Sequence, residues 1–262
     1  EALVRKDIET CGMELYRRGY PWGIVSNGLL MTRERLDALL ASGMHSATIS
    51  LDGFEEAHNW LRRHPKSFEN AVNAICMLAE EKEIVWDVVT CVNQKNFKDL
   101  KLFKEFLMEM GVKRWRLFTI FPVGRAAEEA DLQLTNEQFT WMLNFIRYCR
   151  QEGKIHTSYG CEGFLGNYEA EVRDSIFQCN AGINTASVPF PVVRVSVPIS
   201  PRGISTKINS STSGTTNSSR TATANGHAKG NAPTAKCSVI AKATACICMT
   251  ITAIYCSVII IG

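Results

Sequence analysis

The residues with chemical potential follow two short apolar segments. Residues 22–26 lead into Ser26-Asn27-Gly28, and residues 47–51 lead into Asp52-Gly53 after Ser50-Leu51. A second set follows within residues 58–67, with His58, Arg62 and Ser67. Hydroxyl, amide, carboxylate and guanidinium groups at strand ends are suited to binding a small charged molecule, and an Arg can pair with a carboxylate through two parallel hydrogen bonds.

Each of these residues also has an ordinary structural interpretation. Ser26-Asn27-Gly28 could be a simple turn, and Asp52 could cap the helix that follows it. His58 could lie on a helix surface. Arg62 stands next to Arg63, and the two could form a solvated basic face. The residue types alone therefore do not separate a binding site from turns and caps.

The surrounding pattern predicts helices that alternate with single strands, which indicates a parallel sheet. Strand-end loops in such folds form the ligand site. The predicted helices are residues 7–18, 33–41 with Thr32 as cap, 55–63, 67–80 and 96–110. The predicted strands are residues 22–26, 47–51, 84–92 and 114–121.

The order and spacing of these motifs resemble radical S-adenosylmethionine (radical SAM) enzymes. In that family a strand ending in T/S-N-G precedes one ending in S-L-D-G, then a helix of the form H-x-x-x-R and a G/K-S-F step. Glu1-Ala2-Leu3 is similar to the end of the family's G-G-E-P/A-L motif, and Pro122 to Ala126 to its P-x-G-R-A step. Gly160 to Gly166, Val172 to Asp174 and Cys179 to Gly182 resemble the entry to the auxiliary-cluster region called SPASM.

The resemblance covers residues 1–188 and implies an α/β fold, a partial (β/α)6 TIM-like barrel followed by a C-terminal auxiliary-cluster region. We expect three segments: a partial barrel at 1–125, a linker and the start of the SPASM-like region at 126–188, and a tail at 189–262 that is out of frame or disordered. The expected cofactors are S-adenosyl-L-methionine and [4Fe–4S] clusters. The implied reaction is reductive cleavage of S-adenosylmethionine to abstract hydrogen from a substrate.

The resemblance assigns cofactor-binding roles to four residues, and no catalytic side chain. Glu1 would bind the amino group of the cofactor and Arg62 its carboxylate, while Asn27 and Ser50 would hydrogen-bond the carboxylate or the ribose. For metal binding it points to Cys161 and Cys179 as auxiliary-cluster ligands. The alternative for these two is a pair of loop thiols or a disulfide.

The family's cluster motif, C-x3-C-x2-C, does not occur in this sequence. We expect it to lie N-terminal to Glu1, and the chain by itself to be inactive. Four other cysteines, Cys11, Cys76, Cys91 and Cys149, stand among apolar residues and are interpreted as reduced, buried thiols of a cytoplasmic protein.

The expected partners are a peptide or small-protein substrate and an electron donor such as flavodoxin or ferredoxin. We expect neither nucleic acid nor a membrane as partner. Two other functions remain open: a noncatalytic barrel fragment that holds a partner, and a barrel that binds a phosphorylated metabolite. The isolated glycines Gly43, Gly53 and Gly111 do not favour a phosphate cradle.

The composition changes abruptly near Val188. Residues 1–188 hold all 26 acidic residues and 22 of the 29 Lys and Arg, so the remaining residues carry only positive charge. Back-translating Asn231 to Cys246 and regrouping the bases permits E-C-A-D-C-K-M-F-R-Y-C-E, which contains the C-x2-C-x5-C expected of a SPASM region. We therefore interpret the tail as frameshifted. If it is instead taken literally, Ala243 to Gly262 is long and apolar enough for a membrane anchor.

Overall fold

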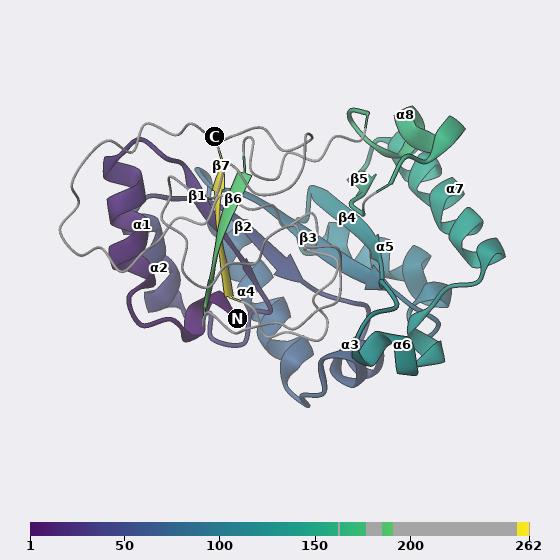
Figure 1. The fold of residues 1–262 in the computed structure, drawn as a ribbon, viewed down its shortest axis with the longest axis horizontal. Helices are drawn as coiled ribbons and strands as arrows, with labels where there is room; N and C mark the ends of the chain where they lie inside the picture. Colours follow the sequence, from purple (N-terminus) through teal and green to yellow (C-terminus); the bar gives the residue numbers. More distant parts are fainter. Residues whose placement is uncertain (162, 177–184, 191–255, 262) are drawn as a thin grey trace, which may run out of the picture.

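The computed structural model describes residues 1–161, 163–176, 185–190 and 256–261, which form one seven-stranded sheet with helices (Figure 1). The strand order is β5-β4-β3-β2-β1-β7-β6. The strands are β1 (Trp22–Ser26), β2 (Met44–Ser50), β3 (Val85–Val92), β4 (Arg114–Thr119), β5 (His156–Tyr159), β6 (Thr185–Phe190) and β7 (Cys256–Ile261).

Helices connect the successive parallel strands. They are α1 (Ile8–Arg17), α2 (Arg33–Ala41), α3 (Glu55–Arg62), α4 (Ser67–Glu80), α5 (Leu100–Glu109), α6 (Arg125–Glu128), α7 (Asn136–Glu152) and α8 (Glu169–Val172), with short 3-10 turns η1 (Ala2–Val4), η2 (Phe97–Asp99), η3 (Ala130–Leu132) and η4 (Gly166–Tyr168). Strands β1 to β5 pair in parallel and in sequence order. Because such crossovers are right-handed, their helices cover one face of the sheet. This confirms the predicted α/β class, with five parallel strands among the described residues.

The core lies between the sheet and these helices. Trp22 of β1 is fully buried against α1, where a Cβ at Gly12 would come within 2.1 Å of the indole ring. Trp115 of β4 packs edge-on against Phe103 of α5 and Phe145 of α7, with ring centroids 5.9 and 6.1 Å apart. Alternate residues of each strand thus face the helices, and the residues between them face the opposite side.

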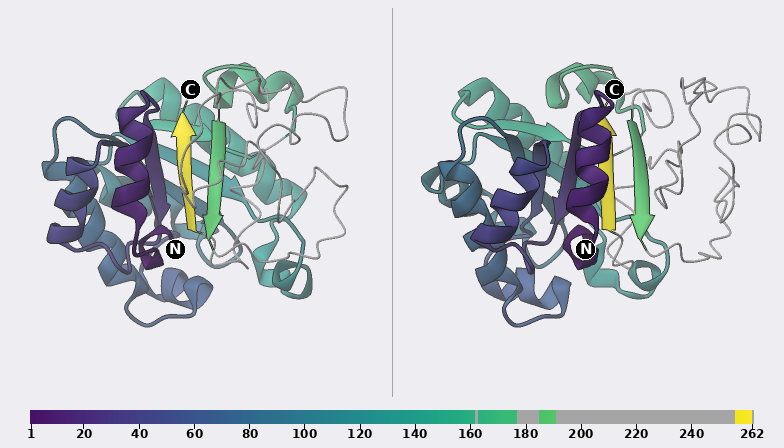
Figure 2. Two further views of the ribbon diagram at one scale, coloured as in Figure 1. Left: turned by 60° about the vertical axis from the view of Figure 1, so that its left-hand side comes forward. Right: turned by 90° about the vertical axis from the view of Figure 1, so that its left-hand side faces the viewer.

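The edge of β1 is occupied by two antiparallel strands. Strand β7 pairs with β1 and β6 pairs with β7, as the yellow and green arrows in Figure 2 show. Residues 256–261 were expected to be disordered or part of an apolar anchor, and for these six residues that expectation is wrong. The run Val258 to Ile261 is β-branched, and β1 offers it an open row of backbone hydrogen-bonding groups.

Residues 191–255 and 262 lie outside the described part of the chain, so the frameshift and the rest of the anchor hypothesis stay predictions. Among the helices that the structure describes, none has the length and hydropathy needed to cross a bilayer. The boundaries of the three expected segments likewise stay predictions.

Candidate functional site

The carboxyl ends of β1 and β2 carry the predicted site, and Glu1 is fixed at the first of them. One carboxylate oxygen of Glu1 accepts a 2.6 Å hydrogen bond from the Ser26 hydroxyl, and the other accepts a 2.9 Å bond from the backbone N–H of Asn27. Glu1 is only 8% exposed. The first oxygen also accepts from the Leu3 N–H at 3.5 Å. A carboxylate has about four acceptor positions, so these three bonds orient Glu1 and still leave capacity for a cation.

The turn after β1 holds these groups in place. The Asn27 side-chain oxygen accepts from the Leu29 N–H at 2.9 Å, and the Ser26 hydroxyl oxygen accepts from the Gly28 N–H at 3.0 Å. Gly28 has φ +78, and a Cβ there would lie 2.8 Å from the Cα of Ala71 on α4. A side chain at position 28 would therefore be strained twice, by its backbone conformation and by the helix behind it.

The end of β2 carries a buried ion pair. Arg62, at the end of α3, donates from Nε to Oδ2 of Asp52 at 2.6 Å, with Asp52 fully buried and the Arg62 side chain 20% exposed. The second carboxylate oxygen of Asp52 accepts from the Cys91 N–H at 2.8 Å. Burial opposes ionisation of Asp52, but the charge of Arg62 outweighs it and holds the pKa of that carboxyl well below its usual range.

The same arrangement keeps Arg62 charged. Burial lowers its pKa, but Asp52 chiefly, with smaller effects from Cys91 and Glu1, raises it above the ordinary value. Glu1 thus lies within electrostatic range of Arg62. The terminal nitrogens of Arg62 have no hydrogen-bond partner among the described residues. An anchored carboxylate and an anchored guanidinium therefore lie within electrostatic range of one another near the ends of β1 and β2.

His58 positions the Asp52 backbone. The Asp52 N–H donates to Nδ1 of His58 at 2.9 Å, so Nδ1 carries no proton and the ring proton is on Nε2. That Nε2–H donates to the Ser67 hydroxyl, 3.0 Å away. His58 is neutral in this arrangement, which means that its 3.4 Å approach to Asp52 is not an ion pair.

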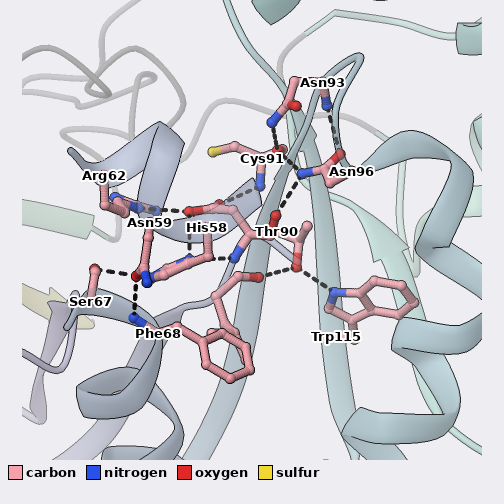
Figure 3. A network of polar contacts seen from close by, with 12 residues as sticks. His58, Asn59, Arg62, Ser67, Phe68, Thr90, Cys91, Asn93, Asn96 and Trp115 are labelled. Atoms are coloured by element: carbon pink, nitrogen blue, oxygen red, sulfur yellow. Dashed lines mark hydrogen bonds and ion pairs between the residues drawn. The ribbon is translucent and has the colours of Figure 1, made fainter. Parts of the chain in front are cut away.

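Figure 3 shows how His58, Arg62, Cys91 and Asn96 converge around the end of β2. The Asn96 amide donates to the carbonyl oxygens of Asp52 and Cys91, both at 2.8 Å, and its oxygen accepts from the Asn93 N–H at 2.9 Å. Thr90 donates to the Leu51 carbonyl at 2.6 Å and accepts from the Trp115 indole N–H at 2.8 Å. These hydrogen bonds hold Asp52 from several sides, which gives a rigid support for Arg62.

Two sequence interpretations are wrong here. Asp52 does not cap α3, whose N-cap is Phe54 without a side-chain bond; its carboxylate is turned instead to Arg62 and Cys91. His58 is not a surface residue, because it is fully buried between the Asp52 backbone and Ser67. The solvated-face interpretation applies to the exposed Arg63 and not to Arg62.

The predicted cofactor residues lie at one end of the sheet. Glu1, Asn27 and Arg62 are placed as described above, and Ser50 is the last residue of β2, 9% exposed, with no hydrogen-bond partner for its hydroxyl among the described residues. Sequence reasoning did not single out Ser26 as the partner of Glu1, nor Asn96 as the support of Asp52. The S-N-G motif, which includes Ser26, could have indicated the partner of Glu1. Nothing in the sequence connects Asn96 with Asp52.

Of the two predicted metal ligands, the structure describes only Cys161. Cys161 is buried, and its sulfur accepts from the Thr119 N–H at 3.1 Å at the end of β4. Cys179 lies outside the described residues. Within the described part of the chain, no group of three or more His, Cys, Asp or Glu could hold a metal ion.

The remaining cysteines fall into two groups. Cys91 and Cys149 are buried free thiols, as predicted, and burial raises the pKa of Cys149 to about 11. For Cys76 and Cys11 the prediction is wrong. Cys76 is exposed because it lies on the outer side of α4, and Cys11 is half-buried and takes part in a disulfide.

Opposite charges thus lie at the carboxyl edge of a parallel α/β sheet, which is the edge at which such folds place their ligand sites. Residues 1–107 match the family model described as the Radical SAM superfamily.

The chain is similar to two AdoMet-dependent heme synthases. It is 29% identical to that of Nitratidesulfovibrio vulgaris, over 52% of this chain and 37% of the relative. It is 26% identical to that of Methanosarcina barkeri, over 62% of this chain and 46% of the relative. It is 27% identical to the sporulation killing factor maturation protein SkfB of Bacillus subtilis over 55% of this chain and 38% of the relative. The crystal structure of Streptococcus suis SuiB bound to precursor peptide SuiA is matched with TM-score 0.49 and 12% identity, over 62% of this chain and 37% of SuiB. The chain spans less than half the length of the curated relatives it matches.

Proposed function

We propose that this chain contains the S-adenosylmethionine-binding part of a radical SAM enzyme that modifies a peptide or small protein. The observation that carries the proposal is a pair of opposite charges, Glu1 and Arg62, each anchored by hydrogen bonds near the ends of β1 and β2 and within electrostatic range of one another. The methionine end of the cofactor is a zwitterion, with an ammonium and a carboxylate. The two anchored side chains complement those two charges.

The residues present fit the cofactor. The Glu1 carboxylate would accept from the ammonium, and the terminal nitrogens of Arg62 would donate to the carboxylate. The Ser50 hydroxyl and the Asn27 amide would contact the carboxylate or the ribose. When bound, the cofactor supplies radical chemistry that abstracts a hydrogen atom. The task of this chain's own residues is to orient the zwitterion before the reaction, and the network behind Arg62 fixes that orientation in advance.

The iron–sulfur cluster does not fit the described residues, because they offer no set of three suitable ligands. Our proposal is that its three thiolates come from a C-x3-C-x2-C motif N-terminal to Glu1, and that Cys161 and Cys179 belong to an auxiliary-cluster region. An iron–sulfur protein or flavoprotein would supply the electron, and the cytoplasm would be the site of action.

The similarity to SkfB, named a maturation protein, supports a peptide substrate. A second candidate is heme synthesis, because relatives with that name reach 29% identity. The two candidates differ in the substrate and agree on the cofactor, so the cofactor site can be tested first.

The test is formation of 5′-deoxyadenosine under anaerobic, reducing conditions. We expect a form extended N-terminally to include the cluster motif to produce it, and the 262-residue chain, loaded with iron and sulfide, to give no more than a no-enzyme control. Product from the 262-residue chain would contradict the proposed source of the cluster ligands. No product from the extended form, with its cluster verified by absorbance, would contradict the proposed reaction.

A further inference from the structure

A polar cluster lies on the face of the sheet opposite the helices. Thr90 of β3 and Trp115 of β4 hydrogen-bond to one another on the helix-covered side. Side chains alternate between the two faces along a strand. Asp87, three residues before Thr90, and Arg116, next to Trp115, therefore face the other side. Thr48 of β2 joins them there. Gly23 of β1 faces the same side, since a Cβ at this position would come within 2.1 Å of the Ser46 hydroxyl.

The three side chains form one connected network across three neighbouring strands. The Thr48 hydroxyl donates to Oδ1 of Asp87 at 2.6 Å. Arg116 donates from Nε to Oδ2 of Asp87, and from Nη2 to Thr48 at 3.0 Å and to Oδ1 of Asp87 at 3.1 Å. The guanidinium also lies 5.7 Å from the centre of the Phe118 ring.

This network leaves one hydrogen-bonding group of Arg116, the nitrogen Nη1, unused. Asp87 is engaged through both oxygens, whereas Nη1 of Arg116, with two N–H donors, has no partner among the described residues. The Arg116 side chain is 33% exposed and that of Asp87 14%. The free donors are therefore within reach of a molecule on this face, next to an aromatic ring.

The position of the cluster relates it to the cofactor site. Thr48 precedes Ser50 by two residues on the same face of β2, a separation of about 7 Å along the strand. A molecule held at Arg116 would thus lie on the face of the sheet opposite the helices, further from the carboxyl ends of the strands than a cofactor held at those ends.

We propose that Arg116, held by Asp87 and Thr48, anchors a carboxylate of the substrate on the face of the sheet opposite the helices. This inference rests on the proposed function, and it adds the chemical class of the substrate group. A carboxylate is a suitable acceptor for the N–H groups of Nη1, because a hydrogen bond between a charged donor and a charged acceptor is stronger than one to a neutral acceptor.

The probes are N-acetylglycyl-phenylalanine and its C-terminal amide, which differ only in the carboxylate. Binding to the 262-residue chain is followed by NMR titration. The variants are Arg116→Gln, Asp87→Asn and, as matched control, Arg114→Gln, which alters an exposed Arg two residues earlier on the same face. Circular dichroism verifies folding of each variant.

We expect the unmodified chain and Arg114→Gln to prefer the acid at least fivefold, and Arg116→Gln to lose that preference. Asp87→Asn should bind the acid severalfold more tightly, because it removes the carboxylate that competes for Arg116. Tighter binding of the acid by Asp87→Asn would not occur if the cluster were only structural. This measurement therefore tests the carboxylate site even if Arg116→Gln fails to fold. Equal binding of acid and amide by the unmodified chain, or weaker acid binding by Asp87→Asn, would overturn the inference.

Failure of the proposed function would be seen separately. S-adenosylmethionine binding by the unmodified protein reports on that function alone. Lack of cofactor binding together with an intact preference for the acid would contradict the cofactor assignment and leave the carboxylate site standing.

Discussion

Replacing Asp52 by Asn tests the buried network most sharply. Asp52 is fully buried, and its carboxylate accepts from Arg62 Nε at 2.6 Å and from Cys91 N at 2.8 Å. If the amide oxygen of Asn keeps the bond to Cys91, the amide nitrogen faces the Arg62 Nε–H, donor against donor. Breaking one side of a buried ion pair costs about 3 to 5 kcal/mol, and the 20% exposure of Arg62 places the expected loss near the lower end, about 3 kcal/mol.

The assay is urea unfolding followed by tryptophan fluorescence at pH 7. Asp37→Asn is the matched control, because Asp37 forms an exposed i,i+4 pair with Arg33. Its loss should be several times smaller than that of Asp52→Asn. Equal losses for the two variants would refute the conclusion that Asp52 supports the site.

The pH dependence of the same comparison has a defined sign. The pKa of Asp52 is lowered in the folded protein, so its ionisation stabilises the fold above the unfolded pKa of about 3.9 and loses that effect as the pH falls toward the folded value. The difference between the unmodified chain and Asp52→Asn should be constant from about pH 7 to 5 and shrink below about pH 4. A difference that grows on acidification would contradict the assigned pKa direction.

Three further predictions concern other parts of the chain. Gly28→Ala should destabilise more than Gly19→Ala, measured by urea unfolding, because both positions have positive φ but only Gly28 would place a Cβ against α4; equal losses would remove the packing argument. Cys76 is exposed and should react with a maleimide in the native protein. Cys149 should react only on unfolding, because it is buried and burial raises its pKa to about 11. Equal labelling of the two cysteines, measured by mass spectrometry, would contradict this. The gene, read in the adjacent frame beyond the codon for about Val188, should stay open and encode C-x2-C-x5-C, and stop codons in that frame would rule out the frameshift.

Most of the fold could be predicted from local patterns. Helices 33–41 and 67–80 and strand 22–26 have the predicted bounds, and Thr32 caps its helix through the Arg35 N–H. Strand β2 begins three residues earlier than predicted because Met44 to Ser46 pair with neighbouring strands despite two polar residues. Strand β5 was not predicted, since His156 to Tyr159 contains few apolar residues and is a strand through its parallel pairing with β4.

The site was predictable only in outline. The motif spacing indicated Glu1, Asn27, Ser50 and Arg62, since strand ends of a parallel sheet meet at one edge. It could not show that Asp52 is held by an N–H that lies 39 residues further along the chain, at Cys91. Buried polar networks of this kind depend on contacts between distant segments, which local sequence patterns do not contain.

The most direct test of the cofactor site is the affinity for S-adenosylmethionine of Arg62→Ala compared with Arg63→Ala, in a form that carries the cluster motif. Arg62 is anchored by Asp52, and its neighbour Arg63 is exposed, so the two variants remove the same charge from adjacent positions. We predict that Arg62→Ala weakens binding by about 1.5 to 3 kcal/mol, roughly ten- to hundredfold, and that Arg63→Ala leaves it within about twofold. Unchanged affinity in Arg62→Ala, or equal losses in both variants, would contradict the assignment of Arg62 to the cofactor carboxylate.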